Sequence, residues 1–203
     1  EDSTSYYNSY TIKSDNGWEE LMDLIKAINL TPQDIDSILN VDRTLWAFAV
    51  NQVVSNLDTY NGYYIHNYYL YQTKDGLFNM IPWDLSESFV GAIMGFSYFN
   101  PSSVYEYNPY FGENSSDGRP LTELLFSNSQ YRKQYTAHIR TIMNDLDSTQ
   151  LRSEINQVQN LAYPAALSDI YKLFSINNFS FNVENDLSFG AWGGYGFGGI
   201  MST

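Results

Sequence analysis

Apolar side chains recur at helical spacing early in the chain. The first such stretch carries acidic residues in its opening turn and has its apolar positions at Trp18, Leu21, Met22, Ile25 and Ile28. The run Thr31-Pro32-Gln33-Asp34 places a capping hydroxyl before a proline, which predicts a short helix through Leu39. We expect Asp42 to cap a third helix, whose apolar residues continue to Val54. A short strand is expected before these helices, over residues 10–13.

The helical period returns in the second half of the chain. Arg119-Pro120 opens one helix, a second covers residues 131–146, and a third begins near residue 151 and is expected to bend at Pro164. Residues 189–203 form a Gly-rich tail, which we interpret as a flexible loop or linker. The pattern thus predicts two groups of three helices.

The residues between the two groups of helices have the pattern of β-strands. Aromatic and apolar runs over residues 68–71 and 77–81 flank Lys74-Asp75-Gly76, which predicts a β-hairpin with a glycine-containing turn that ends at Pro82. Residues 86–118 show no period and are expected to form a long surface excursion, of the kind that walls a site. The prediction is one α+β domain over residues 1–203, mainly α-helical with a central β-hairpin.

Composition narrows the possible functions. The 203 residues carry a net charge of −13, which disfavours nucleic acid as a partner. The absence of cysteine excludes disulfides and thiolate sites, and no apolar run is long enough to be a transmembrane segment. Only 16% of residues are charged, and polarity comes instead from Tyr, Asn and Ser. This balance favours a secreted or cell-surface bacterial protein.

Two aspartates are the strongest candidates for chemistry. Asp58 follows the end of the third predicted helix, and Asp84 follows the second strand of the hairpin. Because a hairpin returns the chain to its starting point, we expect the two carboxyl groups to face one cleft. The order of loop, hairpin and loop is that of protein-kinase-like enzymes, in which one aspartate orients the acceptor hydroxyl and the other holds Mg²⁺ on the nucleotide phosphates.

A structural interpretation of the same residues competes with the catalytic one. Aspartates in loops are usually caps and turn formers. Asn67 could supply a second oxygen ligand for Mg²⁺, although its position also suits a turn amide. His66 is better explained as a structural residue than as a base, and the tyrosines between residues 60 and 71 as core and hairpin faces.

Three joined blocks resemble a known signature. They are Asn56-Leu57-Asp58, then the run from His66 to Tyr71 with Asn67 and Tyr68 at its start, then the run from Phe78 through Trp83 and Asp84 to Leu85. These blocks resemble the signature of the spore coat protein H (CotH) kinase family, and Arg119-Pro120-Leu121-Thr122 also fits it. The resemblance covers about residues 10–190 and is strongest over 45–91.

The resemblance implies an atypical protein kinase, with the chain similar to its C-terminal, larger lobe. Such a domain uses ATP and Mg²⁺ (or Mn²⁺) to phosphorylate secreted or surface proteins. By motif, Asp58 matches the catalytic aspartate and Asp84 the metal-binding aspartate. Asn67 matches a position expected to contact the metal and the cofactor.

The sequence departs from the family pattern at two places. Ser86 stands where the family usually has Asn or Asp, and Val90 separates Phe89 from Gly91. The strands that carry the phosphate-covering loop and the nucleotide-binding lysine would lie upstream, so we expect a missing N-terminal lobe to associate with this chain. On that basis the chain alone is expected to be inactive, whereas its parent protein is expected to be an atypical kinase.

Two hypotheses therefore stand at this point. The first is a CotH-type protein kinase, and the second is a non-catalytic surface or assembly module that retains the kinase-like fold. Trp83 offers a structural check, because we expect it to be buried, holding the loop of Asp84 against the helix of residues 43–56.

Overall fold

The computed structural model describes residues 2–86, 88–90, 107–172, 174–185, 187–189 and 195–197. Its α-helices are α1 (Trp18–Asn29), α2 (Val41–Val53), α4 (Pro120–Ser127), α5 (Ser129–Asp145), α6 (Ser148–Ser168) and α7 (Ile176–Phe181). Its strands are β1 (Tyr68–Gln72), β2 (Phe78–Pro82), β3 (Leu187–Phe189) and β4 (Tyr195–Phe197). Short 3₁₀ helices cover Ser3–Tyr6, Pro32–Ser37, Ser88–Val90 and Ser115–Asp117. The α+β, mainly helical class is confirmed.

The central hairpin forms as the sequence predicts. β1 and β2 pair antiparallel, with Tyr68 opposite Pro82 and Gln72 opposite Phe78. Gly76 closes the turn with a φ of 88°, a conformation that glycine adopts without steric cost. The hairpin therefore brings residue 67 beside residue 83, which decides where the candidate site lies.

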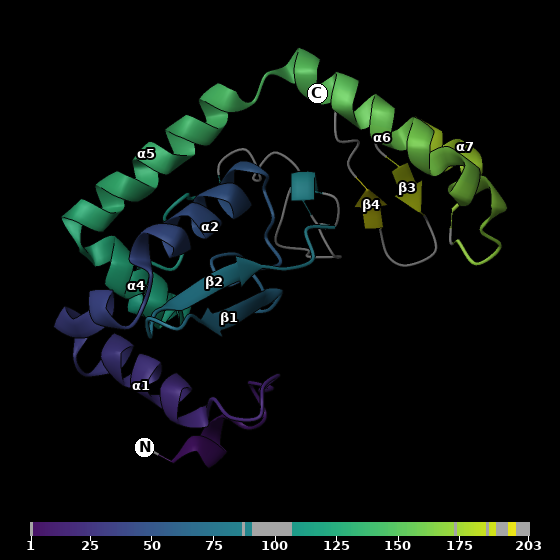
Figure 1. Cartoon of the computed structure of the whole chain (residues 1–203). Coiled ribbons are helices and arrows are strands. Elements are labelled where there is room, and N and C mark those ends of the chain that lie inside the picture. The colour runs from purple at the N-terminus through teal and green to yellow at the C-terminus, as the bar shows by residue number, and fades with distance from the viewer. Residues whose placement is uncertain are drawn as a thin grey trace.

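Helix α2 is the centre of the core. It lies between β2 on one side and α5 on the other (Figure 1), and Leu45, Phe48 and Ala49 are fully buried in it. α1 and α4 close the remaining sides through Leu24 and Leu125. Burying these side chains supplies most of the favourable free energy of folding, at about 25 cal/mol for each Å² of apolar surface removed from water.

Helix α6 extends away from this core and contacts α7 (Figure 1). None of its described side chains is buried, and Pro164 lies inside it while the helix continues to Ser168. No helix of the described part of the chain is both long and apolar enough to cross a membrane.

Several local predictions were wrong. Residues 10–13 form no strand, because Tyr10 contacts β1 through its hydroxyl, 3.5 Å from that of Tyr68, rather than through a backbone ladder. Asp42 does not cap α2; the helix begins one residue earlier and Asn40 Oδ1 accepts the hydrogen bond from the backbone N–H of Arg43. The short helix after Thr31 is a 3₁₀ helix without a side-chain cap.

The two loop predictions can be compared only in part. β4, at residues 195–197 of the Gly-rich tail, pairs antiparallel with β3, which ends at the first residue of the tail, so this part is not the plain linker that we expected. Residue 87 and residues 91–106 of the predicted excursion, and residues 190–194 and 198–203 of the tail, lie outside the described residues.

Candidate functional site

Asp58 lies in a tightly closed loop that follows α2. The carbonyl of Leu57 accepts hydrogen bonds from the backbone N–H groups of Tyr63, at 2.6 Å, and Tyr64, at 3.3 Å. Gly62 passes so close to this carbonyl that a Cβ at position 62 would lie 2.2 Å from the oxygen of Leu57. The loop therefore needs glycine for close approach of backbone to backbone, and it holds Asp58 at its start.

Buried amide side chains fix the same loop to α2. Asn51 donates to the hydroxyl of Thr59 at 3.0 Å and accepts from Asn56 at 3.2 Å, and Asn56 in turn accepts from the backbone N–H of Asp58 at 3.2 Å. Asn61 donates to the carbonyl of Phe48 at 3.2 Å. Since all four side chains are buried, each unmade bond would cost the desolvation of a polar group, and the network specifies one loop conformation.

Two backbone hydrogen bonds hold the loop of Asp84 beside the loop of Asp58. The N–H of Trp83 donates to the carbonyl of Asn67 at 3.0 Å, and the N–H of Phe89 donates to the carbonyl of Val54. The segment after β2 is thus held at both ends against the residues that flank the loop of Asp58. The charge of Asp84 acts on the carboxyl group of Asp58 and raises its pKa.

The carboxyl group of Asp58 has two side-chain neighbours. Asn67 donates to its Oδ2 at 2.7 Å. His66 Nε2 lies 2.8 Å from its Oδ1, but the contact lacks the alignment of a hydrogen bond, so this buried oxygen accepts none from the described residues.

The two carboxyl groups have their pKa values displaced in opposite directions. Burial raises the pKa of Asp58, and the neighbouring charge of Asp84 adds to the effect, against the opposing influence of His66. Hydrogen bonds from Ser86 lower the pKa of exposed Asp84, whose Oδ1 lies 3.2 Å from the backbone N–H of Ser86. Two acids with separated pKa values can divide proton transfer and charge binding between them.

Asn67 and Asp84 also share an unusual backbone conformation. Their φ angles are 57° and 49°, in the left-handed region that non-glycine residues rarely adopt. Asn and Asp tolerate this region better than other side chains, and such residues concentrate at functional sites. The conformation points to a constraint that the surrounding chain imposes on both residues.

The oxygen atoms of the site fit a hard divalent cation. Asp84 is exposed and held ionised, and the hydrogen bond of Asn67 uses its amide nitrogen, leaving the side-chain carbonyl oxygen outside that bond. Carboxylate and amide oxygens are ligands that Mg²⁺ accepts, usually with several waters. The part of the chain that the structure describes contains no cluster of three acidic or histidine side chains that could hold a metal without such help.

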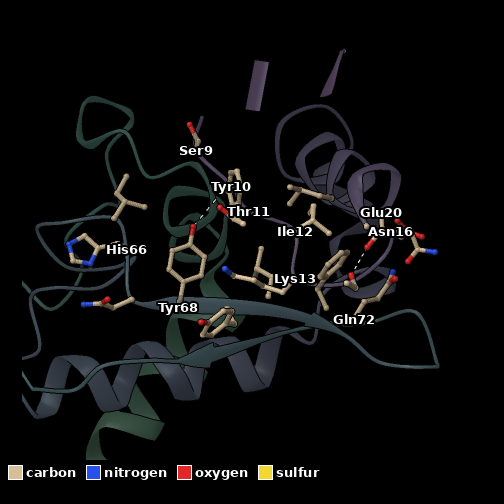
Figure 2. Close-up of a pocket in the computed structure, with 18 residues that line it drawn as sticks. Ser9, Tyr10, Thr11, Ile12, Lys13, Asn16, Glu20, His66, Tyr68 and Gln72 are labelled. Atoms are coloured by element: carbon tan, nitrogen blue, oxygen red, sulfur yellow. Dashed lines mark hydrogen bonds between the residues drawn. The ribbon is translucent and has the colours of Figure 1, made fainter. Parts of the chain in front are cut away.

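A cavity of about 640 Å³ continues from this site. It lies between residues 9–17 and β1, and His66 and Asn67 belong to its wall (Figure 2). Figure 2 shows Tyr68 rising from β1 toward Tyr10, with Lys13 beside it and His66 at one end. Sequence analysis did not predict this cavity, because its wall joins segments more than 40 positions apart.

Trp83 is not buried, contrary to our expectation. Its side chain is 57% exposed and packs edge-to-face on Tyr69, with ring centroids 5.2 Å apart. Trp83 lies just beyond the end of β2, where burial has already changed from buried at Phe78 and Met80 to exposed at Ile81. Trp83 therefore does not pin the Asp84 loop to α2, and with Tyr69 it forms an exposed aromatic surface beside the site.

Comparison with known proteins places these residues in a family. The sequence model described as CotH kinase protein matches residues 1–188, a range that includes all three signature blocks. The chain belongs to the CotH kinase protein family.

A curated relative agrees with this assignment. The chain is 27% identical over 166 residues to the inner spore coat protein H of Bacillus subtilis (strain 168), which is 78% of this chain and 42% of the relative. The chain thus spans less than half of the length of this relative. No solved structure matches the chain, so the kinase-like large lobe remains a prediction.

The described geometry collects the predicted site residues of this CotH chain at one end of the hairpin. Asp58 and Asn67 are in direct contact, and Asp84 lies close enough to influence Asp58. Sequence reasoning took His66 as structural and missed its contact with Asp58. It also missed the buried amide network, for which asparagines within and just after an apolar helix were the available signal.

Proposed function

We propose that this site transfers a phosphoryl group from a metal-bound nucleotide to a hydroxyl group of a protein. The observation that carries the proposal is the contact of Asp58 with His66 and Asn67, which belong to the wall of one cavity, together with the charge of Asp84 that acts on Asp58. A cavity of about 640 Å³ is large enough for a nucleotide, since small-molecule pockets occupy about 300–1,000 Å³.

Asp58 is proposed as the residue that accepts the proton of the acceptor hydroxyl. Its Oδ1 lies 2.8 Å from His66 Nε2, and its raised pKa makes it a better base than an exposed aspartate. Asn67 holds the other oxygen, which fixes the orientation of the carboxyl plane.

Asp84 and Asn67 are proposed to hold Mg²⁺ or Mn²⁺, with ATP as the nucleotide. The bound metal would neutralise phosphate charge, and ATP would supply the phosphoryl group. Lys13 is the only lysine or arginine among the described residues of the cavity wall, where an ammonium group favours an anionic ligand. The wall also contains Tyr10, Tyr68 and Leu70, which suit a flat base.

The proposed place of action rests on the name of the relative. Because the matched relative is named an inner spore coat protein, we propose that this chain acts on secreted or surface proteins, in association with a spore coat or cell surface.

A non-catalytic assembly module is the second candidate function. The exposed aromatic surface of Tyr69, Tyr71 and Trp83 favours it, because large exposed apolar side chains gathered on one face often mark a contact with another protein. Ser86, in place of a possible oxygen ligand, favours it as well.

The two functions are separated by metal-dependent transfer of labelled phosphate from ATP in the full-length polypeptide. We expect Asp58→Asn and Asp84→Asn each to reduce transfer by a factor of about 100 or more, which is the usual effect of losing an acid–base group or a charge clamp. Asp84→Asn should also weaken nucleotide binding, whereas Asp58→Asn should leave it intact.

Asp75→Asn is the matched control. Asp75 lies in the turn at the other end of the same hairpin, where it pairs with Thr73, so its loss should leave transfer within about twofold of wild type. Transfer that survives both site variants would place catalysis elsewhere. A wild-type protein that binds no nucleotide would favour the assembly module.

A further inference from the structure

Arg119 is a buried cation at the start of α4. The residue is 7% exposed, and its guanidinium group donates to backbone carbonyl groups only. Nε donates to Tyr60 at 2.9 Å, Nη2 donates to Gly62 at 3.0 Å and Tyr63 at 2.8 Å, and Nη1 donates to Asp117 at 2.9 Å. Three of the four acceptors belong to the loop that starts at Asp58.

The charge of Arg119 is satisfied without an acid. Within the described residues no carboxylate forms an ion pair with it, and the ring of Phe111 lies 5.6 Å from its guanidinium carbon. A buried charge is costly unless its donors are used, and the planar fork of arginine matches several carbonyls at once. Lysine, which places its donors on one nitrogen, cannot reproduce this pattern.

The backbone of Arg119 is fixed by the helix that follows it. Pro120 and Leu121 continue directly into α4, where Leu121 and Leu125 are buried in the core. The backbone N–H of Leu121 also donates to the hydroxyl of Tyr60 at 3.1 Å. The guanidinium group is therefore a fixed point against which the loop of residues 60–63 is held.

We propose that Arg119 is a positioning residue for the site. Arg119 holds three backbone carbonyls of the loop between Asp58 and Asn67. It thereby fixes the distance between the side chains of Asp58 and Asn67 and the directions in which they point. We call the hydrogen bonds from Arg119 to the carbonyls of Tyr60, Gly62 and Tyr63 the clamp. The effect of the clamp on turnover rests on the proposed phosphotransfer, whereas its effect on the conformation of the loop does not.

The test is Arg119→Lys in the full-length protein, compared with wild type by amide hydrogen exchange and by kinetics. We expect the amides of Tyr63 and Tyr64 to exchange at least tenfold faster, with the amides in the middle of α2 unchanged. For phosphotransfer we expect kcat to fall at least tenfold, while KM for the nucleotide stays within about threefold, because the cavity wall does not include Arg119.

Arg132→Lys is the matched control. Arg132 also packs on an aromatic ring, 3.6 Å from the centroid of Tyr110, and pairs with Glu113, but no described contact joins it to the loop. The Arg132→Lys variant should show wild-type hydrogen exchange at the amides of Tyr63 and Tyr64 and a wild-type kcat.

The outcomes separate the clamp from the activity. Unchanged exchange at Tyr63 and Tyr64 in Arg119→Lys, or equal acceleration there and in α2, would overturn the positioning role. If the wild-type protein transfers no phosphate, the proposed function fails while the exchange result still decides the clamp.

A milder variant keeps the test valid if Arg119→Lys does not fold. Phe111→Leu removes the ring beside the guanidinium group, and half-buried Phe111 also stacks on Tyr63 at 6.0 Å. It should accelerate exchange at the same two amides by a smaller factor, and wild-type exchange there would contradict the inference.

Discussion

Gly62 offers the sharpest test of how the loop of Asp58 is built. A Cβ at this position would lie 2.2 Å from the oxygen, 2.5 Å from the carbonyl carbon and 2.8 Å from the Cα of Leu57. The first of these distances is about 1 Å shorter than an ordinary carbon–oxygen contact. All three atoms are backbone, so no side chain can move aside, and Gly62→Ala must open the loop.

The expected cost follows from what the opening breaks. The hydrogen bonds from Tyr63 and Tyr64 to the carbonyl of Leu57 contribute about 0.5–1.5 kcal/mol each. Residual overpacking adds about 1–3 kcal/mol. We expect Gly62→Ala to lower the free energy of unfolding by about 2–6 kcal/mol, which for a chain of this length corresponds to a fall of about 4–24 °C in melting temperature.

Urea denaturation and thermal melting measure this loss, with Gly76→Ala as the control. Gly76 has a φ of 88° and no atom within 4 Å of its Cβ position, so its variant carries backbone strain of about 1–2 kcal/mol without a clash. Only Gly62→Ala should also accelerate hydrogen exchange at Tyr63. A Gly62→Ala protein within about 0.5 kcal/mol of wild type would refute the close approach as the device that holds Asp58.

Two further substitutions test the electrostatics and the exposed aromatic surface. Because burial raises the pKa of Asp58, its ionised form is disfavoured in the folded state, and this cost is present at neutral pH and disappears as the pH falls through the unfolded value near 3.8. Asp58→Asn should therefore raise the melting temperature at pH 7 but not near pH 3, and an equal change at both would contradict the burial argument. Trp83→Ala should lower the free energy of unfolding by only about 0.5–1.5 kcal/mol in urea denaturation, because the side chain is 57% exposed and its described ring contact is the edge-to-face pair with Tyr69. A loss of about 3–5 kcal/mol, typical of a buried tryptophan, would show that this side chain belongs to the core.

The sequence by itself determined the helices of the core, the hairpin and the family. Apolar positions in α1 and α5 repeat with the helical period, and Lys74-Asp75-Gly76 marks the turn between two aromatic runs. These are local signals, since a period or a turn is defined by residues within a few positions of one another. The signature blocks are also contiguous runs, which is why the CotH resemblance is visible in the sequence alone.

Only the tertiary structure decided which polar residues are buried and what they contact. Asn51 and Arg119 look like ordinary surface residues in the sequence, yet one is the centre of a buried amide network and the other binds carbonyls 56 to 59 positions away. Trp83 shows the reverse, because its size suggested a core residue, whereas its place just beyond the buried part of β2 leaves it exposed.

The physical reason is that the cost of burying a polar group depends on its partners. A buried donor or acceptor is tolerated only where a distant part of the chain supplies the matching group, and such pairs leave no periodic trace in the sequence. The opposite pKa displacements of Asp58 and Asp84 have the same origin, since one carboxyl group is enclosed by the loop and the other is held in solvent by Ser86. The sequence determined which residues could form a site, and the packing of the loop against α2 and α4 decided how they are arranged.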